Sequence, residues 1–167
     1  MTEISSPFSI ATLYEKFSLP LGLQKHMYTT AALGMIICDH WHGPTLKKEN
    51  VVMALLLHDL GNLIKFYLIE IAPVLDKTPL TPYWRSLQEK QKKMYGNDAH
   101  TATLNMVREC INNEEVITLI DGMDTAYLEN IVQSSLEQQI CEYADLRVTP
   151  KGLTSLTERL TDIQKRY

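Results

Sequence analysis

Apolar residues recur at helical spacing along nearly the whole chain. The first segment shows the pattern clearly, since Ile10, Leu13, Tyr14 and Phe17 would lie on one face of a helix. A sustained alternation of apolar and polar residues, which would indicate a half-buried strand, does not occur in the sequence. The pattern therefore predicts an all-α fold, an irregular multi-helix bundle rather than a regular four-helix one.

Helix-breaking residues divide this pattern into separate elements. Pro20 and Gly43-Pro44 interrupt the periodicity early in the chain, and Gly61 is expected to bend the helix that carries His58-Asp59. Asp98 is placed to cap the helix that follows it. The expected helices cover residues 9–17, 22–41, 47–59 with a continuation over 63–71, 84–95, 99–110, 115–120, 125–146 as one or two helices, and 153–165.

The length and composition favour one domain, residues 1–167, with a real core. The chain has 167 residues, and 45% of them are hydrophobic. A domain of this size hides roughly 70% of the surface that its unfolded chain would expose. It needs no disulfide or structural metal to fold, so a metal site would more reasonably serve chemistry.

Charge and cysteine content narrow the class of protein further. The formal net charge is −4, and a dedicated nucleic-acid-binding protein would be expected to be basic. A nucleotide remains possible as a substrate.

The longest apolar stretch, residues 51–57, is too short to span a membrane, and the N-terminus does not resemble a signal peptide. Three widely spaced cysteines fit reduced, buried thiols, so we expect a cytoplasmic protein.

The dipeptide His58-Asp59 is the first candidate for chemistry. It follows Leu55, Leu56 and Leu57 directly, so both polar side chains should lie at the end of a buried helix. A charged aspartate there is costly unless it has a partner. A divalent cation would be one partner, and a simple buried His-Asp hydrogen bond would be another.

Two further residues extend this candidate. His26 lies in the preceding expected helix, where a core histidine with an ordinary hydrogen bond is the alternative reading. Asp145 lies between Ala144 and Leu146 near the end of a late helix and also calls for a partner. Two imidazoles and two carboxylates suit Mn, Fe, Co, Ni or Zn, and suit Mg less well.

The order His…His-Asp…Asp on separate helices resembles the HD-domain superfamily of metal-dependent phosphohydrolases. The resemblance covers roughly residues 20–160, and its most specific part is the middle stretch around His58-Asp59. It implies an irregular HD-domain bundle with one divalent metal held by His26, His58, Asp59 and Asp145. The matching stretches are residues 23–26 (LQKH), 55–62 (LLLHDLGN) and 142–148 (EYADLRV).

The chain departs from the family pattern after the His-Asp pair. Many members have a lysine where this chain has Asn62. Lys65 follows three residues later and would share a helix face with His58 if the helix continued. Lys65 could then supply a cation near a phosphate, or it could reach solvent with only its stem packed.

Between the His-Asp pair and Asp145, His100 is the only histidine. Dinuclear members carry more histidines in that interval, so a single metal is expected. His100 could contact a phosphate, act as an acid or complete a second metal site, and a capping or solvent-facing role is the alternative. His40 and His42, two residues apart, are expected at the surface.

The expected function is hydrolysis of a phosphorylated small molecule, such as a nucleotide or metabolite, by a metal-activated water. The alternatives are a non-catalytic metal- or nucleotide-binding signalling module and an iron-dependent oxygenase of the same superfamily. A homodimer face could form around Tyr67, Leu68 and Ile71. Arg85 and Arg147 could contact a phosphate, but a solvated or salt-bridged side chain is at least as consistent with the sequence for each of them. The expected catalytic residues are Asp59, Lys65 and His100, and the expected substrate-binding residues are Asn62, Lys65, Arg85, His100 and Arg147.

Overall fold

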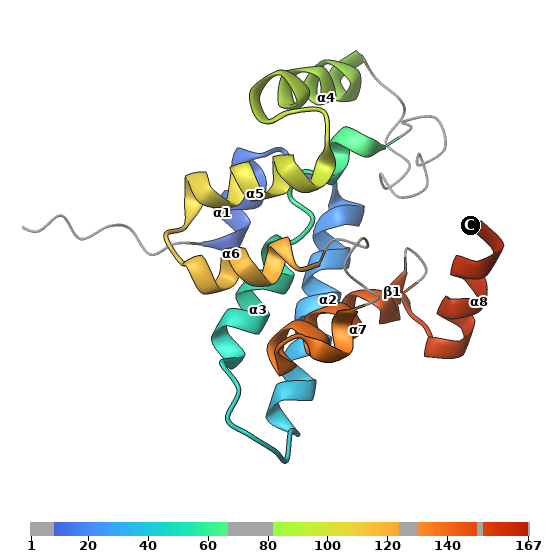
Figure 1. The fold of residues 1–167 in the computed structure, drawn as a ribbon. Helices are drawn as coiled ribbons and strands as arrows, with labels where there is room; N and C mark the ends of the chain where they lie inside the picture. The colour runs from blue at the N-terminus through green and yellow to red at the C-terminus, as the bar shows by residue number, and fades with distance from the viewer. Residues whose placement is uncertain (1–8, 67–81, 124–129, 150–151, 167) are drawn as a thin grey trace, which may run out of the picture.

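The computed structural model describes residues 9–66, 82–123, 130–149 and 152–166, which are mostly helical, as the apolar pattern predicts. Figure 1 shows the helices arranged as an irregular bundle. The proposed dimer face around Tyr67, Leu68 and Ile71 lies outside the described residues. The elements are α1 (Ile10–Lys16), α2 (Leu21–Asp39), α3 (Lys48–Leu57), the 3-10 turn η1 (Asn62–Lys65), α4 (Pro82–Tyr95), α5 (Ala99–Cys110), α6 (Glu114–Asp121), α7 (Leu136–Arg147), β1 (Val148–Thr149), β2 (Gly152–Leu153) and α8 (Leu156–Arg166).

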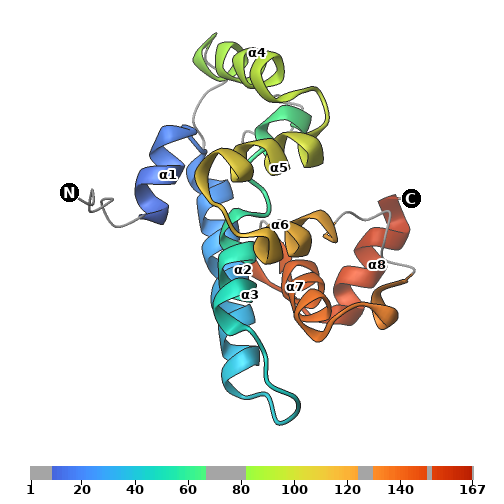
Figure 2. The same ribbon diagram turned by 60° about the vertical axis from the view of Figure 1, so that its left-hand side comes forward.

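The helices α2 and α3 form a closely packed antiparallel pair at the centre of the bundle (Figure 2). Gly34 of α2 makes this approach possible, because a Cβ atom there would lie 2.3 Å from Cδ1 of the buried Leu55. Since the helices run in opposite directions, the first turns of α2 lie beside the end of α3. Residues far apart in the sequence, His26 and His58, therefore meet.

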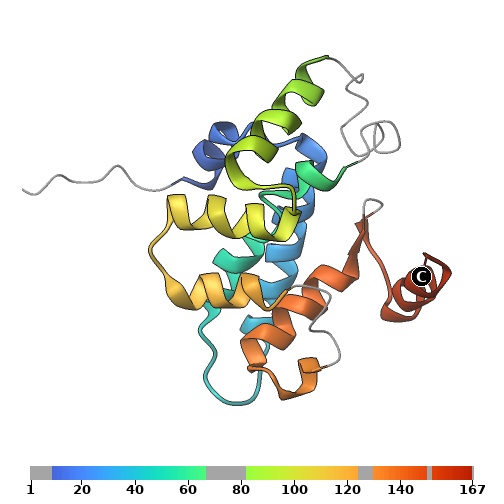
Figure 3. The same ribbon diagram turned by 45° about the horizontal axis from the view of Figure 1, so that its top comes forward.

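One hydrophobic core joins α1, α2, α3, α5, α6 and α7. Met27, Leu55, Met106 and Ile120 are fully buried in it. The Tyr14 hydroxyl donates a hydrogen bond of 2.7 Å to the Leu56 carbonyl oxygen and so attaches α1 to the end of α3. The helix α6 packs against both α3 and α5 (Figure 3), and α5 contacts η1, the turn that follows the end of α3. The core thus brings the expected site residues to one end of the central pair.

The structure differs from the sequence prediction where α3 ends. The helix stops at Leu57, and the next residues form tight turns in which the Leu60 amide binds the Leu57 carbonyl and the Asn62 amide binds the Asp59 carbonyl. Bonds between residues three apart are those of a 3-10 turn rather than an α-helix. The expectation of one bent helix through Gly61 was therefore wrong, and the rest of its predicted continuation, residues 67–71, lies outside the described residues.

A second difference from the sequence prediction is the short antiparallel pair β1–β2 after α7. The last helix therefore begins at Leu156. Val148 pairs with Leu153 and Thr149 with Gly152, whose φ of +106° favours glycine. Two strands of two residues each are too short to produce a visible alternation, so a helix starting at 153 was the natural but wrong expectation. Among the described residues, no helix has both the length and the apolar character needed to cross a membrane.

Gln88, a buried side chain of α4, holds η1 in place. Its amide nitrogen donates to the carbonyl oxygens of Leu63 at 2.7 Å, Phe66 at 2.9 Å and Ile64 at 3.3 Å. Carbonyl groups at the end of a helical turn have no partner within the turn. One side chain therefore satisfies a cluster of buried acceptors beside Lys65.

We predict that Gln88→Met lowers the free energy of unfolding by about 1–3 kcal/mol, because it leaves buried carbonyl groups without a donor while keeping the side-chain volume. Urea denaturation measures the change. Lys90→Met, at an exposed position of the same helix, is the control and should stay within about 0.5 kcal/mol of the parent protein. Equal stability of both variants would contradict the role given to Gln88.

Candidate metal centre

Four side chains from three parts of the chain meet at the end of the α2–α3 pair. His26 comes from the second turn of α2, His58 and Asp59 directly follow α3, and Asp145 comes from the last turn of α7. Leu23 and Met27 next to His26, and Leu55 and Leu57 before His58, are buried core residues that fix these backbone positions. The sequence predicted this convergence, and the structure places all four side chains together.

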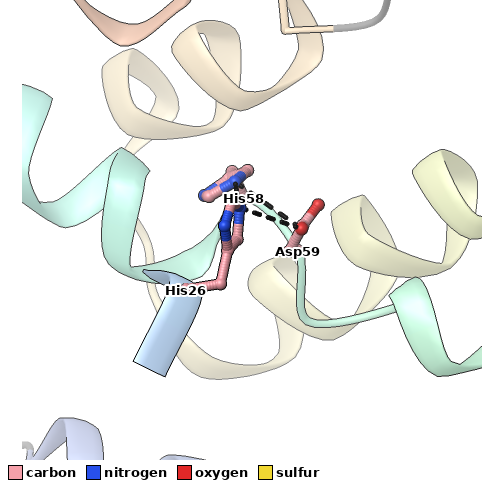
Figure 4. A group of neighbouring side chains, drawn as sticks. All are labelled: His26, His58 and Asp59. Atoms are coloured by element: carbon pink, nitrogen blue, oxygen red, sulfur yellow. Dashed lines mark hydrogen bonds and ion pairs between the residues drawn. The ribbon is translucent and has the colours of Figure 1, made fainter. Parts of the chain in front are cut away.

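The metal-ligating atoms of these side chains lie close to one another. The Nε2 atoms of His26 and His58 are 3.3 Å apart, and Asp59 Oδ2 lies 3.5 Å from the first and 3.7 Å from the second. Figure 4 shows His26, His58 and Asp59 pointing at one another across this space. Asp145 Oδ1 lies 3.0 Å from His26 Nε2 and 3.3 Å from His58 Nε2.

A hydrogen bond to the backbone orients the His58 ring. Its Nδ1 lies 2.8 Å from the Leu55 carbonyl oxygen, which can only accept, so Nδ1 carries the proton. Metal-bound histidines commonly donate their other ring N–H to a carbonyl or carboxylate in this way. The arrangement directs Nε2 of His58 toward the other three side chains, as a metal ligand requires.

The charges around His58 favour a cation at this place. Burial alone would lower the pKa of His58, but the carboxylates of Asp59 and Asp145 outweigh it and raise the pKa to about 9. Burial likewise opposes ionisation of Asp145, and the nearby His58 and His26 overcome it and hold the pKa of Asp145 well below its usual range. The two carboxylates thus favour positive charge at this place, and the group of His26, His58 and Asp59 is spaced to hold a metal ion.

A cavity of about 150 Å³ opens beside these ligands. It joins the metal ligands to other residues that the sequence singled out, including Lys65 and His100. Lys65 reaches the cavity through the 3-10 turn rather than through a continuous helix. The lining residues are His58, Asp59, Asn62, Lys65, His100, Thr103, Met123 and Asp145.

Two expected substrate-binding residues do not line this cavity. Arg85 is exposed on α4. Arg147 holds the β1–β2 region instead, since its Nε donates to the Thr154 carbonyl oxygen and its guanidinium lies 5.4 Å from the centre of the Tyr143 ring. The side chains of His40 and His42 are exposed, as expected.

Sequence reasoning missed the residues that fasten the site to α5. Thr103 Oγ1 accepts a hydrogen bond of 3.0 Å from the Gly61 amide and donates one of 2.9 Å to the Ala99 carbonyl oxygen. It also missed Asp121, whose Oδ1 lies 3.2 Å from His100 Nε2. The cap predicted at Asp98 is confirmed, because its Oδ1 accepts a 2.7 Å hydrogen bond from the Thr101 amide.

Comparisons of the chain with protein-family models, curated proteins and solved structures find no match.

We predict that Gly61→Ala destabilises the protein and weakens metal binding together. A Cβ atom at Gly61 would lie 2.6 Å from both the Ala99 carbonyl oxygen and the Thr103 amide nitrogen, which are backbone atoms of α5. Such overpacking costs roughly 1–3 kcal/mol. Thermal unfolding and zinc or manganese titration measure the two effects.

Gly43→Ala is the matched control for this prediction. A Cβ atom there would meet only the side chain of Trp41, which is partly exposed and can move. Gly43 follows α2 at the end of the pair opposite His26, so metal affinity should not change. A Gly61→Ala variant that binds metal as tightly as Gly43→Ala would show that α5 does not support the site.

Proposed function

We propose that this protein is a metal-dependent phosphohydrolase that acts on a phosphorylated small molecule, either a nucleotide or a metabolite. The observation that carries the proposal is the convergence of His26, His58, Asp59 and Asp145 beside a cavity that also presents Lys65. The resemblance of residues 20–160 to the HD-domain superfamily supports the same activity. Three free cysteines fit the cytoplasmic location that we include in the proposal.

The donor set fits one divalent ion. Two imidazole nitrogens and two carboxylate oxygens favour Mn, Fe, Co, Ni or Zn over Mg. Such an ion lowers the pKa of a bound water to near 7 and polarises a phosphoryl oxygen. Among the described residues, His26, His58 and Asp59 form the one cluster with ligand spacing, which favours a mononuclear hydrolase over a di-iron oxygenase.

The cavity's own residues match the needs of phosphate hydrolysis. Asp59 can accept the proton of the attacking water, because its carboxylate lies at both the ligand cluster and the cavity wall. Lys65 supplies a positive charge for the phosphoryl oxygens, and the Asn62 amide offers a donor next to it. These residues orient and neutralise the phosphoryl group.

The size of the cavity bears on the substrate. At about 150 Å³ it is about half the volume at the lower end of typical small-molecule pockets, roughly 300 Å³. It suits a phosphoryl group, with the remainder of the substrate extending beyond it. A terminal phosphomonoester enters such a space more easily than a phosphodiester, which carries a substituent on both sides.

We predict that Asp59→Ala abolishes phosphatase activity and lowers metal content while the helical fold remains, because Asp59 lies outside the core. The loss of turnover should exceed about a hundredfold. Elemental analysis, circular dichroism and a phosphomonoester panel assayed with several divalent metals measure these effects. His42→Ala, at an exposed histidine, should retain both metal and activity. Undiminished activity in Asp59→Ala would refute the assignment.

We predict that Lys65→Ala mainly raises KM for a phosphomonoester, by about 10–100-fold, because a charge-assisted contact to the phosphate is lost. Metal content should not change, since Lys65 is not a ligand. Steady-state kinetics and elemental analysis test the two statements. The control is Lys93→Ala, at an exposed lysine of α4 that does not line the cavity. If KM is the same in both variants, Lys65 has no part in binding phosphate.

A further inference from the structure

His100 and Asp121 form a pair at the wall of the cavity. His100 is the second residue of α5, and Asp121 is the last residue of α6. His100 Nε2 lies 3.2 Å from Asp121 Oδ1, and the His100 ring also lines the cavity that contains Asp59 and Asp145. One ring nitrogen thus contacts a carboxylate, and the imidazole belongs to the surface that a substrate would touch.

Both members of this pair occupy positions that their helices disfavour. A helix dipole favours negative charge near the N-terminus and positive charge near the C-terminus. Asp121 places a carboxylate at the C-terminal end of α6, and His100 places a basic side chain in the first turn of α5. Residues that break a local rule in this way tend to mark functional sites.

The pair has a fixed position relative to the metal ligands. The Gly61 amide donates to Thr103 Oγ1, and Thr103 Oγ1 donates to the carbonyl oxygen of Ala99, the residue directly before His100. These two buried bonds connect the turn after His58-Asp59 with the first turn of α5. The spacing between the ligand cluster and His100 is therefore set by backbone contacts.

We propose that His100 is the general acid of the reaction and that Asp121 is the positioning residue that orients its ring. This inference rests on the proposed phosphohydrolase function and assigns to it the class of phosphomonoesters with alkoxide leaving groups. An imidazolium carries a proton on each ring nitrogen. One proton binds Asp121, and the other is available to the substrate.

In a phosphomonoester, the proposed step forms one bond between oxygen and phosphorus, breaks another, and moves two protons. The oxygen of a water molecule forms a bond to phosphorus, and the proton of that water passes to the Asp59 carboxylate. The bond between phosphorus and the ester oxygen breaks, and its electron pair stays on the ester oxygen. That oxygen takes the proton from the His100 nitrogen that does not contact Asp121, so an alcohol leaves instead of an alkoxide.

Several other charged groups surround His100. Asp98 lies two residues before it and caps α5, and Lys65 lies on the neighbouring turn η1. Asp59 and Asp145 line the same cavity. Asp98 is a useful control, because it is a second carboxylate close to His100 whose oxygen is already bound to the Thr101 amide.

The test compares two substrates with different leaving groups in the metal-loaded protein. An alkyl phosphate such as glycerol phosphate needs a proton on its leaving oxygen, whereas 4-nitrophenyl phosphate releases a stable anion without one. We expect His100→Gln to lose about 10²–10⁴-fold in kcat on the alkyl phosphate and little on 4-nitrophenyl phosphate. Asp121→Asn should show the same selectivity with a smaller loss, and Asp98→Asn, which keeps the cap, should show none.

Other results would overturn the inference in distinguishable ways. Equal losses on both substrates would mean that the pair is structural or binds phosphate. A fall in bound metal per chain in His100→Gln or Asp121→Asn, by elemental analysis, would make the pair a metal ligand set. Unchanged kinetics in both variants would leave the hydrolase intact and remove the acid role. If the parent protein hydrolyses no phosphomonoester with any divalent metal, the proposed phosphohydrolase function is wrong, and so is the general-acid role of His100.

Discussion

The buried imidazole of His58, lying between the carboxylates of Asp59 and Asp145, is the interaction on which the rest of the site depends. Two carboxylates in such a place repel each other unless a positive charge lies between them. The two carboxylates accordingly raise the pKa of His58 against the opposing effect of burial. The buried residues around α2 and α3 hold the three side chains together despite the cost of burying their charges.

The helical class was predictable because apolar residues recur at helical spacing, and the grouping of His26, His58, Asp59 and Asp145 was predictable mainly from their resemblance to the HD-domain pattern. Apolar residues at helical spacing identified most of the helices, and the capping role of Asp98 followed from its position before α5. Within the HD-domain pattern, these polar side chains also interrupt largely apolar runs. Such residues require partners, and the partners were the other members of the group.

The remaining features depend on tertiary contacts that leave little trace in the sequence. Gly61 looked like a bend in a helix, whereas it marks the place where a turn approaches the backbone of α5. Arg147 resembled a phosphate ligand, but the unforeseen hairpin β1–β2 gives it a backbone acceptor at Thr154. Asp121 follows the buried residues Leu119 and Ile120, but this context does not indicate His100 as its partner. Its position at the end of a helix is visible only when the end of that helix is known.

The four side chains of the candidate site have very different separations along the chain. Three of them lie within one helical hairpin, residues 26–59, whose closing loop is short, whereas Asp145 is 87 residues beyond His58. Closing a short loop costs less chain entropy than bringing distant segments together. The side chains of His26, His58 and Asp59, which are spaced to hold an ion, thus meet through the local pairing of α2 and α3, whereas Asp145 joins them only through the packing of α7 against that pair.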